Sequence, residues 1–118
     1  MTMHWHHLGK ADQIATPLKL YPFQLKNQNQ QIWEIIVYQI NTQLYAMLDQ
    51  CPHRRVPISS KGYFENQKLV CGWHLWQFDP KSGTHVAPPT GNCVPMYPIK
   101  IEDGELWLSI DLESTPPF

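Results

Sequence analysis

The stretch CPHRRVPISSKGYFENQKLVCGWH, residues 51–74, carries the two motifs that decide the fold and the chemistry of this chain. It begins with Cys51-Pro52-His53 and ends with Cys71-Gly72-Trp73-His74, and seventeen residues separate the two motifs. Each motif supplies one thiol and one imidazole. Because thiolates and imidazoles are common metal ligands, the repeated pair predicts a metal centre with four protein ligands.

Three kinds of site use cysteine together with histidine, and the pairing helps to separate them. Structural zinc sites take both residues, but their common spacings bring cysteine next to cysteine and histidine next to histidine. A cysteine–histidine nucleophile pair needs one residue of each kind and leaves the second motif unexplained. A [2Fe–2S] cluster with two cysteines on one iron and two histidines on the other uses all four residues. A zinc-stabilised binding module with the same four ligands remains an alternative.

The sequence around these motifs predicts β-structure. Apolar runs rich in strand-forming residues predict strands over residues 18–25, 32–40, 44–48, 96–101 and 105–110. Asp103-Gly104 lies between the last two runs and is a strong hairpin signal. Eleven prolines and six glycines disfavour long helices. The chain is therefore predicted to be all-β, with a loop-rich insertion over approximately residues 50–89.

From Cys51 onward the chain resembles Rieske [2Fe–2S] domains. Besides the two motifs, the matching elements are Gln77-Phe78-Asp79, Ser82-Gly83, Pro88-Pro89 and Tyr97-Pro98. The resemblance implies one Rieske domain over residues 1–118, in which an antiparallel β-sandwich base carries the inserted cluster-binding subdomain. It also implies that Cys51 and Cys71 bind one iron of a [2Fe–2S] cluster, and that His53 and His74 bind the other.

The resemblance also separates the kinds of Rieske protein. Membrane-complex Rieske proteins carry an extra disulfide, whose cysteines would fall at Val56 and Trp73 in this sequence. Rieske oxygenases need a second iron site with two histidines and a carboxylate, and only His85 follows His74. We therefore expect a soluble ferredoxin that carries single electrons and is not itself an enzyme.

Two groups of Rieske ferredoxins are similar to this chain. The run His74-Leu75-Trp76 and the residue Cys93 are similar to ferredoxins of toluene-monooxygenase-type diiron systems. Ferredoxins of ring-hydroxylating dioxygenases usually have glycines at the positions of Leu75 and Arg55. We therefore favour a diiron monooxygenase system. The alternatives are a dioxygenase ferredoxin, and a redox subunit or sensor of another complex.

The resemblance implies two protein partners. A flavin-containing NAD(P)H reductase would supply electrons, and a terminal aromatic-hydrocarbon oxygenase would receive them. Arg54, Arg55 and Lys61 place positive charge beside the expected cluster, in a chain of net charge −1. A charged rim around an apolar centre suits transient docking. We expect the exposed edges of His53 and His74 in that centre, surrounded by Leu75, Val56 and Pro89.

Composition excludes several other classes of protein. A net charge of −1 lacks the basic excess of a nucleic-acid-binding protein. The longest apolar run has five residues, 44–48, which is too short to span a membrane. The sequence opens with no secretory signal, and its three cysteines cannot all pair with one another. A cytoplasmic, monomeric protein in a reducing compartment is therefore expected.

Several other residues receive structural interpretations. Trp76 is expected to cover the cluster or to relay its electron. Cys93 is expected to be a buried or half-buried thiol outside the ligand set, and His85 an exposed loop residue. The aromatic residues expected to pack in the base are Trp33, Tyr38, Tyr45 and Trp107. The histidines expected in a first strand or loose terminus, rather than in a metal site, are His4, His6 and His7.

Overall fold

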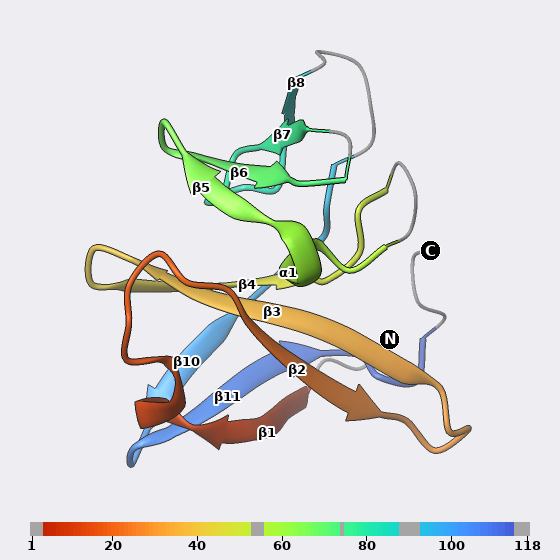
Figure 1. The fold of residues 1–118 in the computed structure, drawn as a ribbon. Coiled ribbons are helices and arrows are strands. Elements are labelled where there is room, and N and C mark those ends of the chain that lie inside the picture. Colours follow the sequence, from red (N-terminus) through yellow and green to blue (C-terminus); the bar gives the residue numbers. More distant parts are fainter. Residues whose placement is uncertain (1–3, 53–55, 74, 88–92, 115–118) are drawn as a thin grey trace.

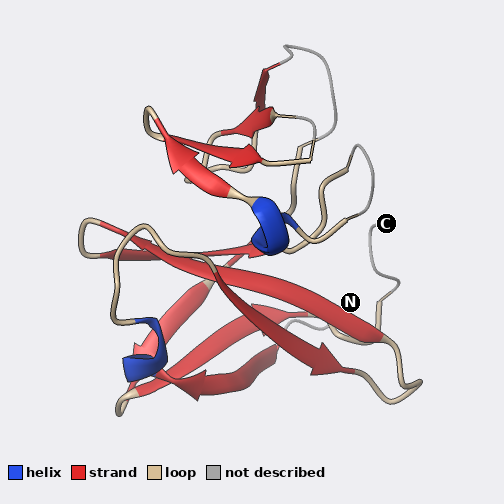
Figure 2. Cartoon of the chain, viewed as in Figure 1, coloured by secondary structure: helices blue, strands red, loops and turns tan. Residues whose placement is uncertain are grey.

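The computed structural model describes residues 4–52, 56–73, 75–87 and 93–114. Within these ranges nearly all regular structure is β-strand, and the strands form three sheets (Figures 1 and 2). Every strand pair in these sheets is antiparallel. The prediction of an all-β fold with antiparallel sheets is therefore confirmed.

The first sheet has the strand order β1-β11-β10. Its strands are β1 (His4–Lys10), β10 (Ile99–Glu102) and β11 (Glu105–Ile110). Every second residue of β11 is buried, namely Leu106, Leu108 and Ile110, so the sheet turns one face to the core. Asp103 (φ 53°) and Gly104 (φ 77°) both lie in the left-handed region that a two-residue hairpin turn requires, which confirms the predicted hairpin.

The second sheet has the order β2-β3-β4-β9. Its strands are β2 (Tyr21–Lys26), β3 (Ile32–Ile40), β4 (Gln43–Leu48) and β9 (Met96–Tyr97). The bounds of β3 are those that the sequence predicts. Ile35, Ile36, Val37 and Tyr38 are all fully buried, because both faces of this strand are covered. We call the first and second sheets together the base.

Two predicted strands differ from the observed ones. The second strand begins at Tyr21 instead of residue 18, because Leu18 has a left-handed backbone (φ 58°) and an exposed side chain. The predicted strand over residues 96–101 is interrupted at Pro98, which has no N–H to give to a ladder. The chain leaves the second sheet there and enters the first, where the Pro98 carbonyl accepts a hydrogen bond from the Ser109 N–H (3.0 Å).

The third sheet lies above the base in Figure 1 and has the order β5-β6-β7-β8. Its strands are β5 (Tyr63–Glu65), β6 (Lys68–Cys71), β7 (Trp76–Phe78) and β8 (His85–Ala87). We call this sheet, with the preceding helix α1 (Ile58–Lys61) and its loops, the loop subdomain. The other described helix is the 3-10 turn η1 (Ala11–Ile14). Both helices have four residues, so no helix in the described part of the chain could span a membrane.

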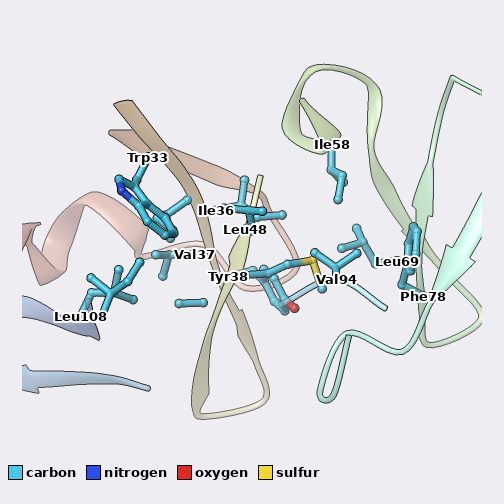
Figure 3. Packing of buried hydrophobic residues seen from close by; sticks show 14 of the residues in the cluster. Trp33, Ile36, Val37, Tyr38, Leu48, Ile58, Leu69, Phe78, Val94 and Leu108 are labelled. Carbon is cyan, nitrogen blue, oxygen red and sulfur yellow. The ribbon is translucent and has the colours of Figure 1, made fainter. Parts of the chain in front are cut away.

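A continuous core joins the base to the loop subdomain, and β3 lies in its middle (Figure 3). Trp33, Val37 and Leu108 lie on one side of β3, and Ile58, Leu69 and Phe78 lie on the other. Tyr38 crosses from the base to the loop subdomain: its hydroxyl donates to the Pro80 carbonyl, and its ring meets Phe64 edge-on at 5.4 Å. The position of the loops is therefore set by the most deeply buried strand of the base.

Candidate metal centre

Two residues separate the end of β4 from the first motif. Cys51 is buried, and its backbone N–H donates to the carbonyl of Val56 at 2.9 Å. This hydrogen bond joins the two ends of the segment that contains His53. His53, Arg54 and Arg55 lie outside the described residues, so their predicted roles remain predictions.

A buried carboxylate fastens the ends of this first loop. Asp49, at 2% exposure, accepts the Ser59 N–H at 2.8 Å through Oδ1 and the Ser59 hydroxyl at 2.6 Å through Oδ2. Burial raises the pKa of Asp49, and the hydrogen bonds from Ser59 oppose part of this shift. The start of α1 is thereby tied to the strand end that leads into Cys51.

The second motif begins at the end of β6. Cys71 is fully buried, and its carbonyl accepts the backbone N–H of Leu75 at 2.8 Å. Leu75 adopts a left-handed backbone (φ 60°), which is unusual for a branched side chain and turns the chain back toward β7. The segment between these two residues contains His74, which lies outside the described residues.

The second motif packs at Gly72 against α1, the helix that follows the first loop. A Cβ atom at this position would lie 2.1 Å from the carbonyl oxygen of Lys61, at the end of α1, so only glycine fits. This contact therefore packs the second motif against the helix that ends the first loop. Cys51 and Cys71 also belong to the same buried cluster. Two buried cysteines at the ends of two packed loops fit the thiolate half of a [2Fe–2S] site.

Aromatic rings pack beside Cys71. Trp76 is half-buried and pairs directly with Cys71 in the register of β6 and β7. The imidazole of His85 stacks on Trp76, with ring centroids 4.2 Å apart and planes 20° apart, and also on Phe78 at 5.2 Å. The prediction that His85 is an exposed loop residue is wrong, since it lies in β8 at 7% exposure. Hydropathy alone could not reveal this, because in β8 the polar His85 is buried and the apolar Val86 is exposed.

Comparison with protein families identifies this arrangement. The family model described as Rieske [2Fe-2S] domain matches residues 4–98. The chain belongs to the Rieske family. The cofactor of a Rieske domain is a [2Fe–2S] cluster with two cysteine and two histidine ligands, as predicted. The zinc-stabilised module considered from the sequence is therefore not supported.

Curated relatives of this Rieske chain include dioxygenase ferredoxins. The anthranilate 1,2-dioxygenase ferredoxin subunit of Burkholderia cepacia is 29% identical over 106 residues, which cover 90% of this chain and 92% of the relative. The ferredoxin component of the p-cumate 2,3-dioxygenase system of Pseudomonas putida is 25% identical over 76 residues. That match covers 64% of each chain, slightly less than two thirds of the relative's length. The match to a longer relative, the 4beta-methylsterol monooxygenase of Methylococcus capsulatus, covers only 20% of that protein.

A solved structure supports the Rieske fold. A chain in the complex of reduced oxygenase and oxidized ferredoxin of carbazole 1,9a-dioxygenase superposes with a TM-score of 0.72 and 20% identity. The superposition covers 89% of this chain and 92% of that chain. At this identity the likeness establishes the fold alone, and it confirms the predicted fold class.

The predicted diiron monooxygenase system is not confirmed, and the dioxygenase alternative fits the comparisons better. Both ferredoxin relatives named above belong to dioxygenase systems. The prediction depended on the run His74-Leu75-Trp76 and on Cys93. These are four residues, whereas the match to the anthranilate dioxygenase subunit extends over 106 residues.

The Rieske loops expose large apolar side chains. Trp73 is 42% exposed and Leu75 is 61% exposed. The Trp73 indole N–H donates to the Ser60 hydroxyl at 3.2 Å, and the Lys61 ammonium lies 5.0 Å from the Trp73 ring centroid. We call Lys61, Trp73 and Leu75 the loop face. Of the other predicted docking residues, Val56 is half-buried, and Arg54, Arg55 and Pro89 lie outside the described residues.

The third cysteine of the Rieske chain is placed differently from its prediction. Cys93 is exposed rather than buried or half-buried. The N–H of the next residue, Val94, donates to the Gly83 carbonyl at 2.9 Å, and the Val94 side chain is buried. Because neighbouring side chains of an extended chain point to opposite sides, Cys93 turns outward.

The three histidines near the N-terminus lie on β1, which confirms that they belong to a first strand. His7 Nε2 lies 3.0 Å from a carboxylate oxygen of Glu105 on the neighbouring strand. The rings of His4 and His6 meet edge-on at 6.5 Å. Among the described residues, no cluster of three or more potential metal-binding side chains forms there or elsewhere.

Proposed function

We propose that this chain is the ferredoxin of an aromatic ring-hydroxylating dioxygenase system, and that it carries single electrons to the terminal oxygenase. The observation that carries the proposal is the match to a dioxygenase ferredoxin subunit over 90% of this chain and 92% of the relative. Such a carrier makes and breaks no substrate bond. Its task is to hold one electron reversibly and to dock briefly with two partners.

We propose Cys51 and Cys71 as the thiolate ligands of one iron, and His53 and His74 as the imidazole ligands of the other. The burial of both cysteines supports the thiolate half. The bound [2Fe–2S] group supplies reversible one-electron chemistry. The chain keeps water from the thiols and fixes the loop ends through the Cys51–Val56 hydrogen bond and the close contact at Gly72.

We propose that the terminal oxygenase and a flavin-containing NAD(P)H reductase dock in turn at the loop face. The exposure of Trp73 and Leu75 supports this proposal, because apolar side chains on loops are available for contact without unfolding. Lys61 gives the loop face positive charge, which steers association with an acidic surface. A monomer is the form that can exchange quickly between two partners.

The ligand set is tested by EPR of the dithionite-reduced protein, with a visible absorption spectrum recorded before reduction. We expect a red-brown protein, and after reduction a rhombic signal with the lowered average g value of histidine-ligated [2Fe–2S]. His53→Ala should abolish this signal, whereas His6→Ala, on β1 of the base, should leave it unchanged. A colourless, EPR-silent protein after iron-replete anaerobic preparation would refute the ligand set.

The partner class is tested by the rate at which the reduced protein reduces a purified terminal oxygenase. We expect faster transfer to the oxygenase of a ring-hydroxylating dioxygenase than to a diiron monooxygenase hydroxylase. Leu75→Glu should slow the transfer about tenfold by placing a charge in the contact. Ile101→Glu is the matched control, since Ile101 is also exposed but lies on β10 of the base. Equal loss in both variants would refute docking at the loop face.

A further inference from the structure

Unpaired buried polar atoms are concentrated at one residue of the loop subdomain. Among the described residues, three buried side-chain nitrogen or oxygen atoms lack a hydrogen-bond partner: Gln50 Oε1, His85 Nδ1 and His85 Nε2. Two of the three therefore belong to one imidazole ring. The ring is stacked rather than hydrogen-bonded, with Trp76 at 4.2 Å and Phe78 at 5.2 Å.

Packing alone does not explain a histidine at this position. A neutral imidazole has one N–H donor and one acceptor nitrogen, and leaving either unpaired in a buried site destabilises the fold. A phenylalanine could make the same ring stack without any unpaired polar atom. The distinctive property of His85 is therefore a polar ring edge inside an apolar layer.

The location of this ring relates it to the metal centre. Trp76, on which His85 stacks, is the cross-strand partner of Cys71, and Phe78 is the cross-strand partner of His85. Cross-strand partners lie on the same face of a sheet, so the rings of Trp76 and His85 share the face of Cys71. The imidazole of His85 therefore stacks on Trp76, and Trp76 in turn pairs across the strands with Cys71, a proposed iron ligand.

On the basis of the ligand set proposed above, we propose that His85 is a tuning residue of the Rieske centre, and that its N–H dipole stabilises the negative charge added on reduction. One electron enters the centre, and His85 neither gains nor loses a proton. Because neither ring nitrogen has a hydrogen-bond partner among the described residues, the ring can adopt either tautomer without breaking a hydrogen bond. A dipole in an apolar layer acts more strongly than one in water.

The test compares a ring without polarity and a polar group without a ring. His85→Phe keeps the stack and removes the dipole, whereas His85→Gln keeps a polar N–H and removes the ring. The midpoint potential of each protein is measured by EPR during a dithionite titration at one fixed pH, and thermal unfolding is recorded on the same samples. His6→Phe is the matched control, because it makes the same substitution on β1 of the base, outside the loop subdomain.

We expect His85→Phe to lower the equilibrium constant for one-electron reduction about threefold, which is about 28 mV at 59 mV per tenfold change. Its melting temperature should equal or exceed that of the wild type, because two unpaired buried atoms are removed. His85→Gln should show a smaller shift in potential together with a lower melting temperature. His6→Phe should leave the potential unchanged.

Two results would overturn the role of His85. An unchanged potential in His85→Phe would mean that the imidazole only fills space. Equal falls in His85→Phe and His85→Gln would mean that repacking, not polarity, moves the potential. If His85→Phe does not assemble the centre, the midpoint potential and melting temperature of His85→Leu are compared with those of the wild type and His85→Gln in its place. Absence of the histidine-ligated EPR signal in the wild type would instead refute the ligand set, so the two failures are distinguishable.

Discussion

The base and the loop subdomain of this chain are built in different ways. In the base, β3 has nine residues and is buried on both faces, and β11 buries every second residue. In the loop subdomain the strands have only three or four residues. Of the candidate ligands, Cys51 and His53 lie in the sequence between β4 and α1, Cys71 ends β6, and His74 lies between β6 and β7.

This difference indicates two sources of stability. Long strands with a regular apolar period stabilise the base through buried area, which tolerates small changes in geometry. Short strands bury too little area to be stable by themselves. The loop subdomain instead depends on individual contacts, such as Gly72 against the Lys61 carbonyl and Tyr38 on the Pro80 carbonyl. The bound cluster adds a further constraint, since metal binding is coupled to folding.

Removal of the cluster should produce the largest difference in stability between the base and the loop subdomain. In the iron-free protein we expect amide hydrogens of β5–β8 to exchange about a hundredfold faster, because the free energy of their local opening falls by about 2.7 kcal/mol. The amides of β3 and β11 should keep most of their protection. Hydrogen exchange followed by mass spectrometry, with the iron-loaded protein in the same buffer as control, measures both regions at once. Uniform loss of protection would mean that the base is not independently stable.

A glycine substitution in each region provides the next comparison. Gly72→Ala drives a Cβ against a backbone oxygen that cannot rotate away, so we expect about 1–3 kcal/mol of destabilisation and a lower iron content. Gly104→Ala is the control in the base. No atom lies within 4 Å of its added Cβ, and only the positive φ of 77° opposes it, at about 1–2 kcal/mol.

Urea unfolding and iron analysis of the two glycine variants give the outcome. Gly104→Ala should lower the unfolding midpoint and leave the iron content unchanged, since its strain lies in the β10–β11 turn. Equal iron loss in both variants would contradict a specific role for the contact between Gly72 and α1.

The base was more predictable from sequence than the loop subdomain, because its signals are local. The apolar run over residues 32–40 and the Asp103-Gly104 turn predict β3 and the last hairpin within short windows. Pro98 shows the limit of this approach. It lies inside an apolar run, and only the three-dimensional arrangement shows that the chain changes sheets there.

The candidate site was predictable only as a set of residue types. The motifs name two cysteines and two histidines, and the structure describes the two cysteines as buried, while the complete ligand set stays a proposal. The need for glycine at position 72 depends on Lys61, eleven positions earlier, and no local pattern reveals that contact. The burial of His85 likewise depends on Trp76 and Phe78 from another strand. Contacts between segments distant in the sequence determine these features, and the spacing of apolar residues along the chain does not predict such contacts.

Loss of a hydroxyl that joins the two regions should have a smaller effect. Tyr38→Phe leaves the buried Pro80 carbonyl without its donor, which should destabilise the protein by about 1 kcal/mol. Hydrogen exchange should increase in β7 and β8 more than in β11. Tyr45→Phe, on the neighbouring strand, is the control, because its half-buried ring stacks on Tyr38 but belongs to the base. An equal increase in exchange in both variants would argue against a specific link through Tyr38.

The last comparison concerns alkaline pH and the base alone. Burial in β9 raises the pKa of Tyr97 from 10.0 to about 12. The folded protein therefore holds this proton more tightly than the unfolded chain does. The resulting contribution to stability is complete below about pH 10 and is lost as the pH rises through about 12.

Tyr97→Phe removes this titration, so its urea midpoint should fall less steeply than that of the wild type above about pH 10. Some slope should remain, because burial also raises the pKa of Tyr38. The visible spectrum of the cluster should persist through the first part of the fall, since Tyr97 pairs with β4 and not with the loop subdomain. Parallel curves for the two proteins would exclude a contribution from Tyr97. Bleaching of the cluster before any loss of stability would mean that the loop subdomain, rather than the base, is the alkali-sensitive region.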